Sequence, residues 1–266
     1  MNDPTLDGST PARSISFVDR AVAVLPFAGL ATVLLLALVW HDVLPGGWRL
    51  RFCFGPDARR QGLRDAAHLA ERLEQFEREN PTIAPGSILF LGSSTIERFP
   101  LEEAFPGKPC LNRGIANLPA GVLAANLAAC IPPAPPAGVV LYAGSVDWRA
   151  SGRDDAVLLD RVAAVVDATA RELPGVPLLL LGLLPERGTP PDAVAALRRA
   201  NERLAALASE RSMAFLDPAR PPIADPSGAL SEDASTDLFH LNTEGYRHLA
   251  GWIAEEGGRV GALLAP

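Results

Sequence analysis

The sequence has little of several residue types, and these shortages exclude whole classes of protein. Its 266 residues include three cysteines and a single lysine, Lys108, and the aromatic residues make up 6%. The cysteines lie far apart and form no Cys-x-x-Cys or Cys/His pattern, so we expect buried thiols and no metal site. A net charge of −7, with so few aromatic residues, argues against the basic or base-stacking surfaces that nucleic-acid binding needs.

One long apolar run accounts for much of the mean hydropathy of +0.15. Residues 21–40 (AVAVLPFAGLATVLLLALVW) contain no charged side chain, and twenty helical residues rise about 30 Å, the thickness of a bilayer core. A cleaved signal peptide would have a shorter apolar region and a small-x-small cleavage site. A buried globular helix would show a polar face. The run therefore predicts an uncleaved transmembrane anchor.

The arginines that flank this run bear on its orientation. Two precede it and four follow it, at positions 13, 20, 49, 51, 59 and 60, which leans toward a cytoplasmic C-terminal side. Large translocated domains override so small a difference, and we expect the domain after the anchor to be extracytoplasmic, at the cell envelope. The predicted organisation is a polar tail (1–20), the anchor (21–40), a linker (41–56) and one domain (57–266).

That domain alternates short apolar runs with amphipathic segments. We expect strands at 87–92, 109–112, 138–143, 176–183 and 213–216. We expect helices at 57–80, 119–130, 154–173, 191–211 and 243–256. Continuous apolar strands such as VVLY are typical of a parallel sheet covered on both faces. The alternation predicts an α/β fold, a three-layer α/β/α sandwich whose site lies at the carboxyl ends of the strands.

The segments that follow the strands carry the candidate chemistry. Gly92-Ser93-Ser94 permits a tight turn with an exposed hydroxyl before a helix, although the same residues also suit a plain helix cap or a phosphate-binding turn. No Gly-Lys-Ser/Thr follows, which excludes a P-loop. After the second strand, Gly114 could present an unobstructed backbone N–H. Glu97 and Arg98 are expected at the exposed start of a helix, although both could border the pocket. His68 lies in an amphipathic helix without a ligand cluster.

An aspartate and a histidine near the C-terminus complete the set. Serine attacks an ester well only when a base takes its proton, and histidine is that base near neutral pH. Asp237 and His240, three residues apart before a helix, can share a hydrogen bond through one ring nitrogen and leave the other free for Ser94. The pair alone is more typical of a surface helix cap.

Together these segments resemble the SGNH (GDSL-type) hydrolase family. FLGSSTIERF resembles its nucleophile block, LNRGIAN its second block, VLYAGSVDW its third and DLFHLNTEGY its Asp-x-x-His-x-Asn block, over residues 87–246. The resemblance implies a flavodoxin-like parallel five-stranded sheet and hydrolysis of acyl esters or thioesters, without a cofactor. It also implies roles for four residues: Ser94 as nucleophile, His240 as base, Asp237 as the orienting carboxylate, and Gly114 with Ser94 as backbone oxyanion donors.

One position departs from the family pattern. The third block reads Gly-x-Asn-Asp in the family, and its asparagine is an oxyanion donor, but here Val146 stands in that place. Losing one such donor typically costs about 10²–10³ in kcat. Three functions stay open. The first is an ester hydrolase acting on an acylated glycan or lipid, with Ser145 or Asn117 in the pocket as partial substitutes. The others are an acyltransferase with the same triad and a non-catalytic, membrane-tethered carbohydrate- or lipid-binding protein on the same fold.

Overall fold

The computed structural model describes Thr32 and residues 56–266. Within the second range it describes side chains from residue 61 onward. The predicted anchor at 21–40, the tail and most of the linker lie outside these residues. No helix within the described part of the chain is long and apolar enough to cross a bilayer. Contacts between Cα atoms separate the chain into two units, 1–63 and 64–266, and the second unit holds the sheet.

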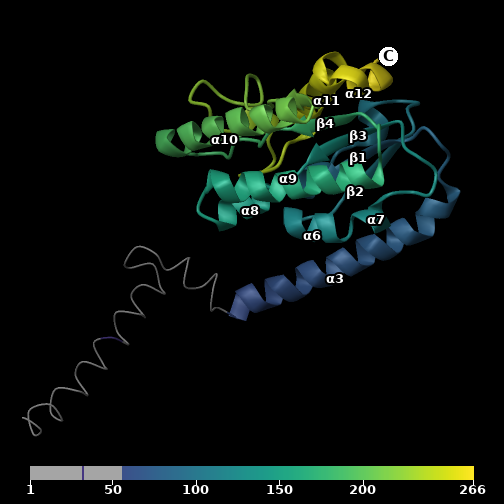
Figure 1. The fold of residues 1–266 in the computed structure, drawn as a ribbon. Helices are drawn as coiled ribbons and strands as arrows, with labels where there is room; N and C mark the ends of the chain where they lie inside the picture. The colour runs from purple at the N-terminus through teal and green to yellow at the C-terminus, as the bar shows by residue number, and fades with distance from the viewer. Residues whose placement is uncertain (1–31, 33–55) are drawn as a thin grey trace, which may run out of the picture. The chain divides into compact units, whose positions relative to one another are not determined.

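The described residues of the second unit build one five-stranded sheet in the order β2-β1-β3-β4-β5, with every pair of neighbours parallel (Figure 1). The strands are β1 (Ile88–Gly92), β2 (Cys110–Gly114), β3 (Gly138–Tyr142), β4 (Leu178–Leu181) and β5 (Ala214–Leu216). All five predicted strands are therefore present, each within three residues of the predicted bounds. β1, β3 and β4 are buried throughout, as continuous apolar runs in a covered sheet should be.

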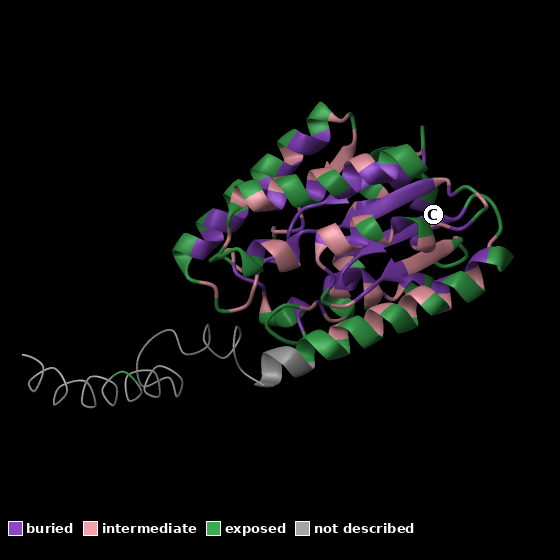
Figure 2. Ribbon diagram, turned by 60° about the horizontal axis from the view of Figure 1, so that its bottom comes forward, coloured by how far each residue is buried: buried purple, intermediate pink, exposed green. Residues whose placement is uncertain are grey.

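Helices cover both faces of the sheet and complete the predicted three layers (Figures 1 and 2). The longer helices are α3 (Pro56–Glu79), α9 (Asp155–Glu172), α10 (Pro191–Glu210) and α11 (Thr243–Glu256). The shorter ones are α4 (Ser94–Glu97), α5 (Leu101–Ala104), α6 (Ala120–Ala125), α7 (Leu127–Cys130), α8 (Ser145–Ala150) and α12 (Gly258–Leu264). The single helix predicted at 119–130 is two helices, because Asn126 leaves helical geometry at φ −111°, ψ 11°.

Alternation along the strands divides the core into two halves. Leu89 and Leu91 of β1 pack on one face with apolar residues of α3, α6, α7, α9 and α10. Ile88 and Phe90 point to the other face and pack with apolar residues of α4, α5, α11 and α12. The nucleophile helix α4 and the helix that follows the predicted base, α11, therefore lie on the same side of the sheet.

A buried arginine fastens α3 to the sheet. Arg113 of β2 is only 1% exposed, and its guanidinium lies 4.5 Å from the ring centroid of Phe76. It donates to Glu79 Oε2 at 2.5 Å and to Asn80 Oδ1 at 2.9 Å. Such charge-assisted bonds hold the C-terminal end of α3 against β2.

Candidate active site

The strand that leads to Ser94 ends in a turn that only glycine allows. A Cβ on Gly92 would overlap the carbonyl oxygen of Tyr142 on the neighbouring strand β3. The chain therefore turns sharply out of β1, and Ser94 becomes the first residue of α4. No hydrogen bond to the backbone N–H of Ser94 is found among the described residues, as expected for a group in the first helical turn.

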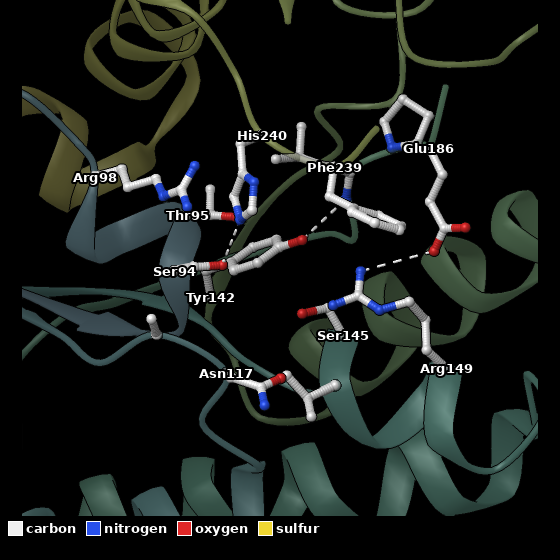
Figure 3. Close-up of a pocket in the computed structure, with 14 residues that line it drawn as sticks. Ser94, Thr95, Arg98, Asn117, Tyr142, Ser145, Arg149, Glu186, Phe239 and His240 are labelled. Carbon is white, nitrogen blue, oxygen red and sulfur yellow. Dashed lines mark hydrogen bonds and ion pairs between the residues drawn. The ribbon is translucent and has the colours of Figure 1, made fainter. Parts of the chain in front are cut away.

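Ser94, His240 and Asp237 form a continuous hydrogen-bonded chain (Figure 3 shows its first link). His240 Nε2 lies 3.0 Å from Ser94 Oγ. His240 Nδ1 lies 2.9 Å from Asp237 Oδ1 and 2.8 Å from Oδ2. Because an ionised carboxylate only accepts hydrogen bonds, Nδ1 carries the proton and Nε2 faces the serine hydroxyl as an acceptor. The structure thus brings together the three residues predicted as nucleophile, base and orienting carboxylate.

Local backbone geometry lowers the pKa of Asp237, whose side chain is 45% exposed. Burial of the carboxyl raises the pKa of Asp237, but hydrogen bonds from the N–H of Phe239, the ring of His240 and the N–H of His240 outweigh it and lower the pKa to about 2. Both backbone N–H groups donate to Oδ1, at 2.8 and 2.9 Å. The backbone of the turn before α11 therefore holds the carboxylate beside the imidazole.

A cavity of about 350 Å³ opens beside this chain of residues. It is lined by Ser94, Thr95, Arg98, Ala116, Asn117, Tyr142, Ser145, Val146, Arg149, Leu184, Pro185, Glu186, Phe239 and His240 (Figure 3). Both predicted pocket residues, Ser145 and Asn117, are among them, and so is Val146. The lining thus combines polar and apolar side chains with the Ser94 hydroxyl, as small-molecule sites do.

Gly114, the predicted oxyanion donor, is not part of this pocket. Its N–H donates to Asn112 Oδ1 at 3.0 Å, and its carbonyl accepts from Arg72. A Cβ at Gly114 would overlap the backbone nitrogen of Glu97, so glycine lets β2 and α4 approach closely. The glycine of the second block is thus a packing residue here, and its N–H is already satisfied.

Asn117, three residues further on, does line the pocket, together with Ser94. Its φ of 55° lies in the left-handed region, which asparagine tolerates better than most residues. Its side-chain amide donates to Asp65 at 2.7 Å, so the side chain is committed to α3. Within the described part of the chain no acceptor is found for its backbone N–H, which is therefore available to a ligand.

Three charged residues border the pocket: Arg98, for which the sequence left this position open, and Arg149 and Glu186, which sequence reasoning missed. Arg98 Nη1 lies 3.7 Å from Asp237 Oδ2, so this guanidinium supports the orienting carboxylate. On the other side, Arg149 lies 3.7 Å from Glu186 and its guanidinium is 5.1 Å from the ring centroid of Phe239. Of these residues, only Arg98 could be linked to the site from the sequence, because it follows the predicted nucleophile by four residues. Arg149 and Glu186 come from segments that no motif marks.

A serine, a histidine and an aspartate linked in this order at the carboxyl edge of a parallel sheet form the arrangement found in serine hydrolases. The model of the GDSL-like lipase/acylhydrolase family matches residues 98–248 of this chain. The chain belongs to that family. The matched segment includes Asp237 and His240 and begins four residues after Ser94.

Solved structures with the same fold agree with this assignment. A candidate platelet activating factor from Streptococcus pneumonia is 23% identical, with a TM-score of 0.67 over 75% of this chain and 97% of its own. A GDSL-like lipase from Bacteroides thetaiotaomicron is 19% identical, with a TM-score of 0.58 over 69% and 95%. A mutant of Axe2, an acetyl-xylooligosaccharide esterase from Geobacillus Stearmophilus, is 17% identical, with a TM-score of 0.53 over 66% and 96%. Identities this low establish the shared fold alone, and no curated protein sequence matches the chain.

Proposed function

We propose that the protein is a serine esterase that hydrolyses acyl esters through an acyl-enzyme on Ser94. The observation that carries the proposal is the 3.0 Å contact between Ser94 Oγ and His240 Nε2, with Nδ1 held by Asp237. The same geometry that lets the imidazole take the serine proton also stabilises the imidazolium that results.

The reaction proceeds in two balanced halves. Ser94 Oγ attacks the acyl carbonyl carbon while His240 Nε2 takes the hydroxyl proton. As the tetrahedral intermediate collapses, the bond to the alcohol oxygen breaks and His240 returns the proton to that oxygen. Water then attacks the acyl-serine with His240 again as base, which releases the carboxylic acid and restores Ser94.

Backbone N–H groups stabilise the oxyanion in this proposal. Ser94 and Asn117 both line the pocket and both have an N–H without an acceptor among the described residues. Val146 lines the same pocket and offers no side-chain donor, so we expect two donors where the family pattern has three. The enzyme is then complete but slower than a relative with asparagine at this position.

The pocket favours a short acyl group. Its volume of about 350 Å³ is at the small end of the roughly 300–1,000 Å³ typical of ligand sites. Leu238 and Phe239, which are 54% and 39% exposed, lie beside the base and offer an apolar surface to the rest of the substrate. Because an acetyl-xylooligosaccharide esterase has the same fold, we propose short-chain esters, such as acetylated glycans, as substrates and longer acyl lipids as poorer ones.

Labelling of the purified protein with a fluorophosphonate tests the proposal directly. We expect the wild type to be labelled and to hydrolyse p-nitrophenyl acetate faster than p-nitrophenyl palmitate. Ser94→Ala should abolish both reactions, whereas Ser209→Ala, at an exposed serine of α10, should change neither. Folded wild-type protein that is neither labelled nor active would refute the esterase and favour a binding role. Acyl transfer to an added sugar acceptor would identify a transferase.

We also propose that residues 21–40 anchor this domain in a membrane, with the domain outside the cytoplasm. The support is the charge-free apolar run of bilayer length. The full chain should sediment with membranes and resist carbonate extraction, and protease added to intact cells should cleave the domain. Release of the full chain by carbonate would refute the anchor.

A further inference from the structure

A carboxylate on the nucleophile helix reaches across to the loop that forms the proposed oxyanion hole. Glu97 is the last residue of α4, three residues after Ser94, and its side chain is 24% exposed. Its Oε2 accepts a short hydrogen bond from the backbone N–H of Ala116. Glu97 does not line the active-site cavity, so it would act on the reaction only through this loop.

The second partner of Glu97 comes from α3. His68 Nε2 lies 3.1 Å from Glu97 Oε1 and 3.0 Å from Oε2. Since the carboxylate can only accept, His68 Nε2 is the donor. The histidine therefore restrains the carboxylate from α3. Charge-assisted bonds of this kind are roughly twice as strong as bonds between neutral groups.

The bond to Ala116 matters because the next N–H along the chain belongs to Asn117. Peptide groups are planar, so two rotations about the Cα of Ala116 decide where the Asn117 N–H points once the Ala116 N–H is fixed. The loop is also tied to α3 on both sides of this point. The Asn117 amide donates to Asp65 at 2.7 Å, and Gly114 O accepts from Arg72 Nη2 at 3.0 Å.

We propose that Glu97 is a positioning residue of the esterase: it holds the Ala116 N–H so that the Asn117 N–H faces the oxyanion, and His68 braces its carboxylate. This inference rests on the proposed function, because it concerns the transition state of that reaction. A donor aimed at the oxyanion acts on the transition state more than on the bound ester, so its displacement lowers kcat and leaves KM nearly unchanged.

Three substitutions at one position separate the hydrogen bond from the charge. Glu97→Ala removes the acceptor, and Glu97→Asp keeps the charge but is one methylene too short to reach Ala116. Both should lower kcat for p-nitrophenyl acetate by about tenfold to a hundredfold, with KM within threefold of the wild type. Glu97→Gln keeps an acceptor oxygen for Ala116 and should restore kcat to within about threefold.

Glu102→Gln is the matched control, because Glu102 is an exposed residue of the neighbouring helix α5 and should leave both constants unchanged. Thermal melting of each variant confirms that it is folded, and Glu97→Asp keeps the test available should Glu97→Ala not fold. A wild type without esterase activity or fluorophosphonate labelling would refute the proposed function itself. An active wild type with an unchanged kcat in Glu97→Asp, equal losses in the Gln and Asp variants, or losses confined to KM would overturn the role of Glu97 alone.

Discussion

Replacing Asp237 by asparagine should disable the base without disturbing the fold. Asp237 Oδ1 accepts from the N–H groups of Phe239 and His240 and lies 2.9 Å from His240 Nδ1, while Oδ2 lies 2.8 Å from Nδ1 and 3.7 Å from Arg98. An asparagine keeps both backbone bonds only if its oxygen takes the place of Oδ1. Its NH₂ group then takes the place of Oδ2, beside the imidazole.

This orientation changes the tautomer of the histidine. The NH₂ group can donate only to an unprotonated Nδ1, which moves the ring proton to Nε2, 3.0 Å from Ser94 Oγ. A protonated Nε2 cannot take the serine proton. A tautomer error of this kind lowers kcat by about 10⁴, or about 5 kcal/mol in activation free energy, in a serine protease triad.

Steady-state hydrolysis of p-nitrophenyl acetate measures the loss, with thermal melting as the check on folding. Asp233→Asn removes the same charge from an exposed residue four positions earlier and should leave kcat unchanged. A folded Asp237→Asn protein whose kcat falls by less than about tenfold would show that Asp237 does not orient the base, and would remove the physical basis of the triad.

Three further outcomes follow from the same geometry. Val146→Asn should raise kcat for p-nitrophenyl acetate by tenfold or more by adding a donor; an unchanged rate would show that the donor is already supplied. Asn117→Ala should lower kcat and stability because alanine resists φ 55° and loses the bond to Asp65, whereas Asn117→Gly loses only that bond and should keep more of both, as melting and kinetics would reveal. The pKa of Asp237 is lowered from 3.8 to about 2, so the unfolded chain binds the proton more readily, and stability should fall as pH drops from about 4 toward 2. That fall, followed by melting, should be shallower in Asp237→Asn.

The sheet could be predicted because short stretches of sequence are enough to identify each strand. Apolar runs such as those of β1 and β3 are buried on both faces, and the alternation of strands with helices leaves one arrangement of layers. The break at Asn126 was not predictable from periodicity, because the apolar spacing continues through it. The break depends on the backbone dihedral angles of Asn126 alone.

The candidate site also has residues that the sequence predicts and residues that it does not. Ser94, Asp237 and His240 stand in short motifs at strand or helix ends, so their meeting was foreseeable. The absence of Gly114 from the pocket was not, because its N–H is taken by an asparagine two residues before it, whereas Asn117 was already among the predicted pocket residues. The contact between His68 and Glu97 joins residues 29 positions apart, and neither stands in a pattern that points to the other.

The turn that carries the base has a consequence for how this enzyme could change its preferences. Phe239 forms part of the cavity wall with its side chain, yet contributes to the triad only through its backbone N–H, which donates to Asp237. Every residue except proline supplies that N–H. The side chain at position 239 can therefore vary in size and polarity while the catalytic chain stays intact, so substrate choice and catalytic power are separately adjustable within four consecutive residues.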